Sequence, residues 1–290
     1  MISTEIDFHA PTDLAGALQL LAEHGDDITV LSGGMSLLPM MNLGLAAPER
    51  MLSLRQVDGL TAIVDEGDAV LIGGMATHRD VATHEVVRAA APAVATAASL
   101  IGDVQVRNRG TIGGSVSHAD PAADYVPSVC AHGGEVILSS ARGERSVPAA
   151  EFFLDVMFTA RQPDEIVTAV RVPRLPAGAV AEYIRFARVE GSFAIVNAAV
   201  VLAPSGSRIA LGGVGGSPVI LDIDEHGASG WGEEAAEAVG DAAFEACVDV
   251  QGDIMSDAVY RREMARVHAK RVVSRAAARL NSGTSQGATS

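Results

Sequence analysis

The chain has 290 residues, a length that favours two or three packed units over one compact core. Its formal net charge of −15 argues against a nucleic-acid groove or an anionic membrane surface as its partner. Its one lysine, Lys270, does not stand beside a glycine-rich loop, which excludes a Walker phosphate loop.

The first part of the chain predicts a β-α-β unit that ends in a glycine-rich loop. Residues 5–8 read as a strand, and Thr12 or Asp13 is suited to cap a helix that ends at Gly25. A second strand follows, and the loop after it reads S-G-G-M-S-L-L-P-M-M over residues 32–41. Paired glycines after a strand leave backbone amides accessible to a phosphate. The pattern G-x-G-x-x-G does not occur here, which disfavours a Rossmann fold.

The middle of the chain predicts an α+β unit around a second glycine-rich stretch. Strands are expected at residues 69–72, 135–140 and 166–172, the last two paired, with helices near residues 77–87 and 92–100. Between them, residues 107–127 read R-N-R-G-T-I-G-G-S-V-S-H-A-D-P-A-A-D-Y-V-P. The glycines and small hydroxyls fit a nucleotide cradle of backbone amides, and a tight hairpin without a ligand is the alternative. Asp120 precedes a proline and suits a turn, and a carboxylate a few residues after the glycines, as at Asp120 and Asp124, suits a ribose hydroxyl or an adenine amino group better than a phosphate.

The last part predicts antiparallel strands followed by helices. The sequence R-L-P-A-G at residues 174–178 is the clearest linker. After it we expect strands at residues 181–189, 194–203 and 208–214, a helix at 233–250, and a final helix capped by Ser256 that ends at Leu280. The predicted division is 1–55, 56–175 and 178–282, followed by a polar, disordered tail at 283–290.

Two other groupings of reactive residues are disfavoured. Ser117, His118 and Asp120 could suggest a hydrolase triad, but triad residues so close in sequence rarely point at one another, and there is no G-x-S-x-G elbow. The histidines that could suggest a metal site lack a recognisable ligand spacing: His78, His84, His118 and His132. We therefore predict no metal ligands and no catalytic side chains in this chain.

The cysteines predict neither a disulfide framework nor a metal cluster. Cys130 and Cys247 stand far apart and are too few for a zinc or iron–sulfur site, so each is expected to be a small buried hydrophobic residue. The sequence has no signal-type apolar segment and no apolar run long enough to span a bilayer. We expect a cytoplasmic location, with the inner face of the membrane as the alternative.

Together the two glycine-rich stretches resemble the flavin-binding subunit of the molybdenum hydroxylases, the group of the carbon monoxide dehydrogenase medium subunit and the FAD domain of xanthine dehydrogenase. The matching patterns are S-G-G-M-S-L-L-P-M-M at residues 32–41 and the stretch from Thr111 to Pro127. The resemblance runs to about Leu280. It implies an α+β fold: a two-part FAD-binding domain, similar to vanillyl-alcohol oxidase and PCMH-type domains, and a C-terminal α+β domain with an antiparallel sheet and helices.

The resemblance also implies which residues bind FAD, without a covalent bond. The first loop contributes Ser32, Gly33, Gly34, Met35, Ser36 and Leu37 to the pyrophosphate. The second contributes Thr111, Gly113, Gly114 and Ser115, with Ser117 nearby and Asp124 at the nucleotide end. Ile101 and Ile166 match apolar positions beside the flavin, Tyr183 a tyrosine that covers the isoalloxazine, and Arg185 a position that is frequently basic. Relatives often have Gly-Asp after this segment, where this chain has Gly191-Ser192.

The function implied is electron transfer by FAD within a heterotrimer. A large partner subunit would carry molybdopterin, and a small partner subunit would carry the 2Fe-2S clusters that reduce the FAD. The external acceptor would be a quinone, NAD or oxygen, and the assembly a dimer of heterotrimers. One alternative is a nucleotide-binding or assembly protein of the same fold without flavin redox activity. A second is a self-sufficient flavin oxidoreductase of the vanillyl-alcohol-oxidase type. The substrate of the complex is left open between carbon monoxide, an aldehyde, a purine and an N-heterocycle.

Overall fold

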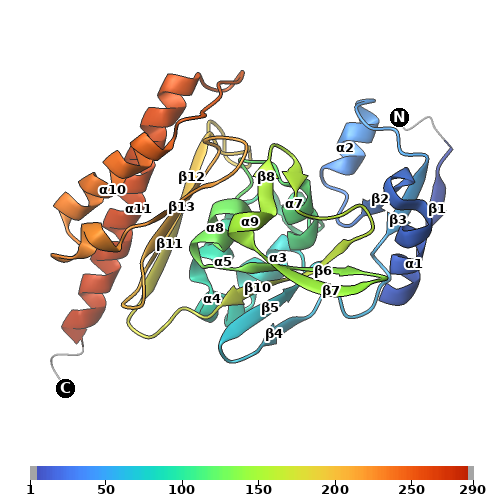
Figure 1. Ribbon diagram of the computed structural model, residues 1–290, viewed down its shortest axis with the longest axis horizontal. Coiled ribbons are helices and arrows are strands. Elements are labelled where there is room, and N and C mark those ends of the chain that lie inside the picture. Colours follow the sequence, from blue (N-terminus) through green and yellow to red (C-terminus); the bar gives the residue numbers. More distant parts are fainter. Residues whose placement is uncertain (1–4, 287–290) are drawn as a thin grey trace.

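The N-terminal unit is a small parallel sheet with one long helix packed against it (Figure 1). The computed structural model describes residues 5–286, with side chains described up to residue 282. The unit contains β1 (Asp7–His9), α1 (Leu14–His24), η1 (Gly25–Asp27), β2 (Ile28–Leu31), α2 (Leu37–Asn42) and β3 (Arg50–Ser53), and its strand order is β1-β3-β2. Of the two predicted caps of α1, Asp13 is the one that the structure shows, accepting the N–H of Gly16 at 2.8 Å, and Gly25, with a φ of 54°, ends the helix as predicted.

The middle unit is an antiparallel sheet in the order β4-β5-β10-β6-β7, with helices packed against it. Its elements are β4 (Ile63–Asp65), β5 (Ala69–Gly73), α3 (His78–Thr83), α4 (Glu85–Ala90), α5 (Pro92–Leu100), α6 (Val104–Arg107), α7 (Ile112–His118), α8 (Tyr125–Ala131), β6 (Glu135–Ser140), β7 (Gly143–Pro148), α9 (Ala149–Phe152), the small hairpin β8 (Phe153–Asp155) and β9 (Phe158–Thr159), and β10 (Ile166–Pro173). The predicted pairing of β6 with β10 is confirmed, since Val136 lies opposite Val170.

The C-terminal unit is an antiparallel sheet between two groups of helices (Figure 1). It contains β11 (Val180–Phe186), β12 (Val196–Leu202), β13 (Arg208–Gly212), β14 (Val219–Asp222), η2 (Asp224–Gly227), α10 (Glu233–Ala246) and α11 (Ala258–Gln286). One face of the sheet packs on α5 and α8 of the middle unit, and the other packs on α10 and α11. Because side chains alternate along a strand, Tyr183 joins the core of the middle unit and Ile184 joins the core under α10 and α11.

The α+β class and the antiparallel C-terminal sheet are confirmed, and the final helix differs from the prediction at both ends. Asp257, and not Ser256, caps α11, because its Oδ1 accepts the N–H of Tyr260 at 2.8 Å. The helix continues past Leu280 to Gln286, into the predicted tail, and residues 287–290 lie outside the described residues. The division into separate domains stays a prediction. Among the described residues, no helix is both long and apolar enough to cross a bilayer.

Candidate functional site

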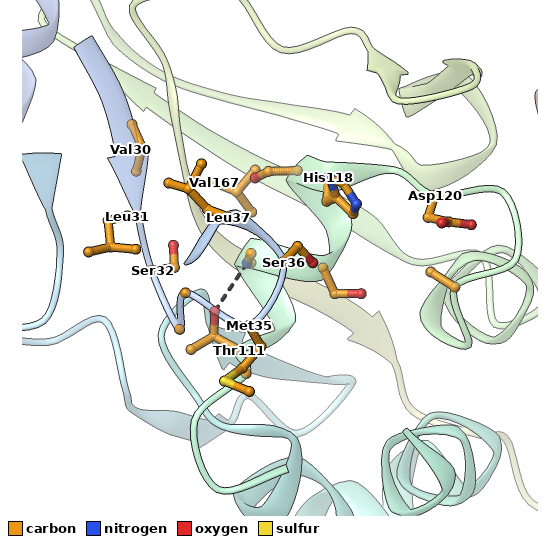
Figure 2. A pocket seen from close by; sticks show the side chains of 18 of the residues that line it. Val30, Leu31, Ser32, Met35, Ser36, Leu37, Thr111, His118, Asp120 and Val167 are labelled. Carbon is orange, nitrogen blue, oxygen red and sulfur yellow. Dashed lines mark hydrogen bonds between the residues drawn. The ribbon is translucent and has the colours of Figure 1, made fainter. Parts of the chain in front are cut away.

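The candidate site is a cavity of about 610 Å³ where the N-terminal unit meets the middle unit. This volume lies within the range of small-molecule and cofactor sites. Its walls include β2, the loop before α2 and helix α7 (Figure 2). The loop after β11 lines it as well. All the site residues expected from the sequence line this cavity except Tyr183 and Arg185. Two motifs far apart in sequence are therefore parts of one site.

The loop at residues 32–36 offers free backbone donors to the cavity. Its five N–H groups have no hydrogen-bond acceptor within the described part of the chain. Gly34 has a φ of 74°, a left-handed conformation that glycine adopts without strain, and it lets the chain turn into α2. Successive N–H groups of this kind form an anion site, which supports the predicted phosphate cradle on this loop.

The second glycine stretch is built differently from the amide cradle expected for it. Residues 112–118 form helix α7, with Thr111 as its cap, and the amides at its start are already bonded within the protein. The N–H of Ile112 donates to Ala76, that of Gly113 to Gly74 at 2.9 Å, and that of Gly114 to the Thr111 hydroxyl at 3.2 Å (Figure 2). The tertiary contacts fix this short helix, so the cradle interpretation is corrected here. What remains for a ligand is the hydroxyls of Ser115 and Ser117, which line the cavity.

The glycines of the second stretch allow backbones to approach closely. A Cβ at Gly113 would lie 2.6 Å from the carbonyl oxygen of Gly74, and a Cβ at Gly110 would lie 2.5 Å from Nε2 of His78. His78 is buried, its Nδ1 is 3.1 Å from the Tyr125 hydroxyl, and burial lowers its pKa to about 4. This histidine is therefore a neutral packing partner of the loop, as is typical of a structural histidine.

Asp124 lines the cavity with a carboxylate that the protein also holds from behind. Its side chain is only 6% exposed, and it accepts a short hydrogen bond from the Tyr183 hydroxyl and pairs with Arg185 at 3.3 Å. Burial raises the pKa of Asp124 above its ordinary value, and the charge of Arg185 and the Tyr183 hydrogen bond oppose that rise. Asp120 also lines the cavity, and its Oδ1 accepts the N–H of Ala122 at 2.8 Å, as expected of a turn cap.

Tyr183 and Arg185 lie behind the cavity wall, although the resemblance implied that Tyr183 covers the isoalloxazine and that Arg185 belongs to the FAD site. Tyr183 is 3% exposed, and its ring is part of the hydrophobic core. Its hydroxyl donates a hydrogen bond to Asp124 and therefore points away from solvent. The side chain of Arg185 is 10% exposed and is likewise directed at the protein. Of the predicted apolar residues, both Ile101 and Ile166 line the cavity itself.

The lining residues that the sequence analysis did not assign to the site include Phe193 and Arg161. Phe193 carries a half-exposed aromatic ring on the loop after β11, directly after the Gly191-Ser192 pair. Arg161 is the one arginine or lysine among the described residues that line the cavity. Its Nη1 donates to the carbonyls of Gln162 and Glu165, each at 2.9 Å, and burial lowers its pKa. The position of Phe193 directly after the Gly191-Ser192 pair was a weak sequence signal for a role in the site. No sequence signal pointed to Arg161.

The donor set of the cavity fits a nucleotide cofactor. Free amides and small hydroxyls suit a pyrophosphate, a carboxylate suits a sugar hydroxyl, and apolar walls such as Val30 and Val167 suit a flat ring. Ser32 and Ser36 of the first loop and Thr111 before α7 all line the cavity (Figure 2), and a Cβ at Gly114 of α7 would lie 3.4 Å from the Cβ of Ser32. Within the described residues, no group of three or more His, Cys, Asp or Glu side chains is placed to hold a metal ion.

Comparison with known proteins gives consistent relatives over almost the whole chain. A family model described as the FAD binding domain in molybdopterin dehydrogenase matches residues 4–175. The carbon monoxide dehydrogenase medium chain of Hydrogenophaga pseudoflava is 37% identical, over 96% of this chain and 99% of that protein. The nicotine 6-hydroxylase medium subunit of Paenarthrobacter nicotinovorans is 34% identical, over 94% and 98%.

Solved structures agree with these relatives. A chain of carbon monoxide dehydrogenase from Hydrogenophaga pseudoflava superposes with a TM-score of 0.89 at 36% identity, over 97% of this chain and 99% of that one. A chain of quinoline 2-oxidoreductase from Pseudomonas putida 86 superposes with a TM-score of 0.88 at 28% identity, over 97% and 99%. The similarity therefore covers all three units of the chain and both glycine motifs.

Proposed function

The chain belongs to the family of FAD-binding medium subunits of molybdenum hydroxylases, and from this membership we propose that it is the electron-transfer subunit of such a complex. As an oxidoreductase subunit it binds FAD, which supplies the redox chemistry by accepting electrons and passing them on. The observation that carries the proposal is one cavity in which the free amides at residues 32–36 face the hydroxyls of α7.

The residues of the cavity divide the work of holding FAD. The amides of residues 32–36 and the hydroxyls of Ser115 and Ser117 would bind the pyrophosphate, with no lysine required. Asp124 would accept a hydrogen bond from a nucleotide hydroxyl. Thr111, Gly113 and Gly114 bring α7 against the sheet and so set the distance between the two loops. The apolar walls and the ring of Phe193 would exclude water from a bound flavin.

The proposed partners are a large subunit with molybdopterin and a small subunit with 2Fe-2S clusters. In support, several relatives are named medium chains or subunits of a complex. Cys130 and Cys247 are buried, and burial raises the pKa of their thiols to about 12 and about 11, as for hydrophobic side chains and unlike cluster ligands. The assembly we propose is a dimer of heterotrimers in the cytoplasm, which reduces an external quinone, NAD or oxygen.

The substrate is proposed to be chosen by the molybdenum subunit and not by this chain. The relatives act, by their names, on carbon monoxide, nicotine, caffeine and glyceraldehyde. One medium-subunit fold thus accompanies substrates with little chemistry in common. Because FAD would occupy this cavity, the cavity does not select between carbon monoxide, aldehydes, purines and N-heterocycles as substrates of the complex.

Anaerobic rapid mixing of the reconstituted complex with its substrate tests the proposed electron transfer from the iron–sulfur clusters to the FAD of this chain. We expect the flavin absorbance to bleach after the iron–sulfur absorbance, and not to bleach when the FAD-loaded chain meets the substrate alone. Bleaching of the isolated chain by a small substrate would identify a self-sufficient oxidoreductase instead. Reduced clusters beside a permanently oxidised flavin would contradict electron transfer through this subunit.

A further inference from the structure

Arg185 joins three segments of the cavity wall without lining the cavity. Its Nη1 donates to the carbonyl oxygen of Leu100 at 2.7 Å and lies 3.3 Å from the Asp124 carboxylate. Its Nη2 makes a short hydrogen bond to the carbonyl oxygen of Ser192. The side chain is 10% exposed, so these protein groups surround most of the guanidinium. A planar guanidinium can serve several acceptors in different directions, which a lysine ammonium does less well.

Each of these acceptors belongs to, or directly precedes, a segment that lines the cavity. Leu100 ends α5 and precedes Ile101, and Asp124 directly precedes α8 and itself lines the cavity. Ser192 stands next to Phe193 on the loop after β11. These segments also meet one another, because a Cβ at Gly191 would lie 3.3 Å from the carbonyl oxygen of Gly102. The guanidinium of Arg185 in β11 thus connects parts of the cavity wall that lie far apart in the sequence.

We propose that Arg185 is a positioning residue of the FAD site, which holds the carboxylate of Asp124 in place and fixes the loop that carries Phe193, without touching the cofactor. This inference rests on the proposed function. It assigns to Arg185 and Tyr183 an action through Asp124, in place of the flavin contact that the resemblance implied for Tyr183 and the cofactor-binding position that it implied for Arg185.

The groups around Asp124 give the direction of the effect. Arg185 and Tyr183 reach its carboxylate from β11, Asp120 adds a negative charge from the preceding turn, and Tyr125 lies next in sequence. Asn197 of β12 is uncharged. Arg185 is the single cation among these described neighbours. Without it, burial and Asp120 both favour the protonated acid, so the pKa of Asp124 rises further.

Titration of FAD into apoprotein across acid to neutral pH, with dissociation rates, tests the proposal. A charge-assisted bond from FAD to Asp124 needs the carboxylate, so affinity falls as pH falls through the pKa of Asp124. Arg185→Met should move the midpoint of that fall to higher pH and weaken FAD binding at neutral pH roughly tenfold to a hundredfold. Arg185→Lys should keep the midpoint near that of the parent but release FAD faster, because an ammonium cannot hold Leu100 and Ser192 together.

Asp124→Asn should remove the midpoint in both the parent and the Arg185→Met background. The matched control is Arg188→Met, the same substitution at an exposed position three residues later, which should change nothing. An unchanged midpoint in Arg185→Met, or a midpoint that survives Asp124→Asn, would overturn the proposal. If Arg185→Met does not fold, Arg185→Lys tests the proposal: release of FAD at the parent's rate would contradict the role of Arg185 in holding Leu100 and Ser192 together. A parent chain that binds no FAD at all would instead contradict the proposed function.

Discussion

Gly33 lies so close to the carbonyl oxygen of Arg109 that a Cβ on the glycine would overlap it. This contact joins the loop after β2 to the segment just before α7, two parts of the chain that are distant in sequence. The φ of Gly33 lies outside the left-handed region, so its backbone conformation alone would allow another residue. The close contact with Arg109 explains why the loop nevertheless needs glycine here. The requirement is room for a neighbouring backbone, and the distance between the two walls of the cavity depends on it.

Gly33→Ala is expected to separate these walls. The added methyl group meets backbone, which cannot rotate away as a side chain can, so one of the two loops must shift. We predict at least a tenfold loss of FAD affinity and a loss of stability of about 1–3 kcal/mol. FAD titration and urea unfolding measure the two effects.

Gly16→Ala provides the control for that substitution. Gly16 lies inside α1, where the nearest atoms to an added Cβ are at 3.5 Å. Alanine is the better helix former, so this variant should be equally stable or more stable, with parent affinity for FAD. If both variants bind FAD like the parent, the Gly33 contact does not set the geometry of the site.

Asp124 and Asp120 are expected to differ in what their loss costs. Asp124→Asn removes a charged acceptor that lines the cavity, and FAD affinity should fall roughly tenfold to a hundredfold. Asp120→Asn weakens a turn cap on Ala122, which should cost about 1 kcal/mol of stability and leave FAD affinity nearly intact. FAD titration and thermal unfolding of both variants measure the difference. The reverse pattern would exchange the roles of the two carboxylates.

The sequence predicted the local parts of this site and not their long-range partners. Gly25 and the choice of Thr12 or Asp13 as the cap of α1 follow from short-range signals, and the structure confirms Gly25 and selects Asp13. The seven residues of α7 include Gly113 and Gly114, which are poor helix formers, so tertiary bonds such as Gly113 to Gly74 decide its conformation. No short-range signal announces such bonds.

The same limit applies to the two residues that the structure moved off the cavity wall. Tyr183 and Arg185 lie two apart on β11, so alternation correctly predicts that they share a face of the strand. It cannot say that this face meets Asp124 of α8 across a shared core. The loop after β11 brings Phe193 to the cavity for a similar long-range reason, since Arg185 and Gly102 hold its backbone.

Two buried histidines should make the protein less stable in acid. Burial lowers the pKa of both His78 and His132 to about 4, whereas in the unfolded chain each has its ordinary pKa of 6.5. Between these values the unfolded state binds more protons, so stability falls as pH falls from about 6.5 to about 4. Each histidine contributes at most about 3 kcal/mol to that fall, and the raised pKa of Asp124 opposes it.

His132→Gln tests this dependence away from the cavity. Nε2 of His132 is buried without a hydrogen-bond partner among the described residues, so protonation there gains no acceptor. Urea unfolding of parent and variant should give a smaller loss of unfolding free energy with acid in the variant. An equal pH dependence of the unfolding free energy in parent and variant would contradict this prediction, because it would mean that His132 is protonated as easily in the folded state as in the unfolded state.

The most direct test of the account is the state of the flavin in the purified chain. We predict an oxidised-flavin spectrum with one FAD per chain, because this cavity offers one set of free amides that suits a pyrophosphate. No histidine or cysteine occurs in the loop at residues 32–41, and the cysteines are buried, so acid precipitation should release all of the flavin as FAD. A colourless protein that takes up no FAD, or flavin that stays with the precipitate, would contradict noncovalent FAD binding in this cavity.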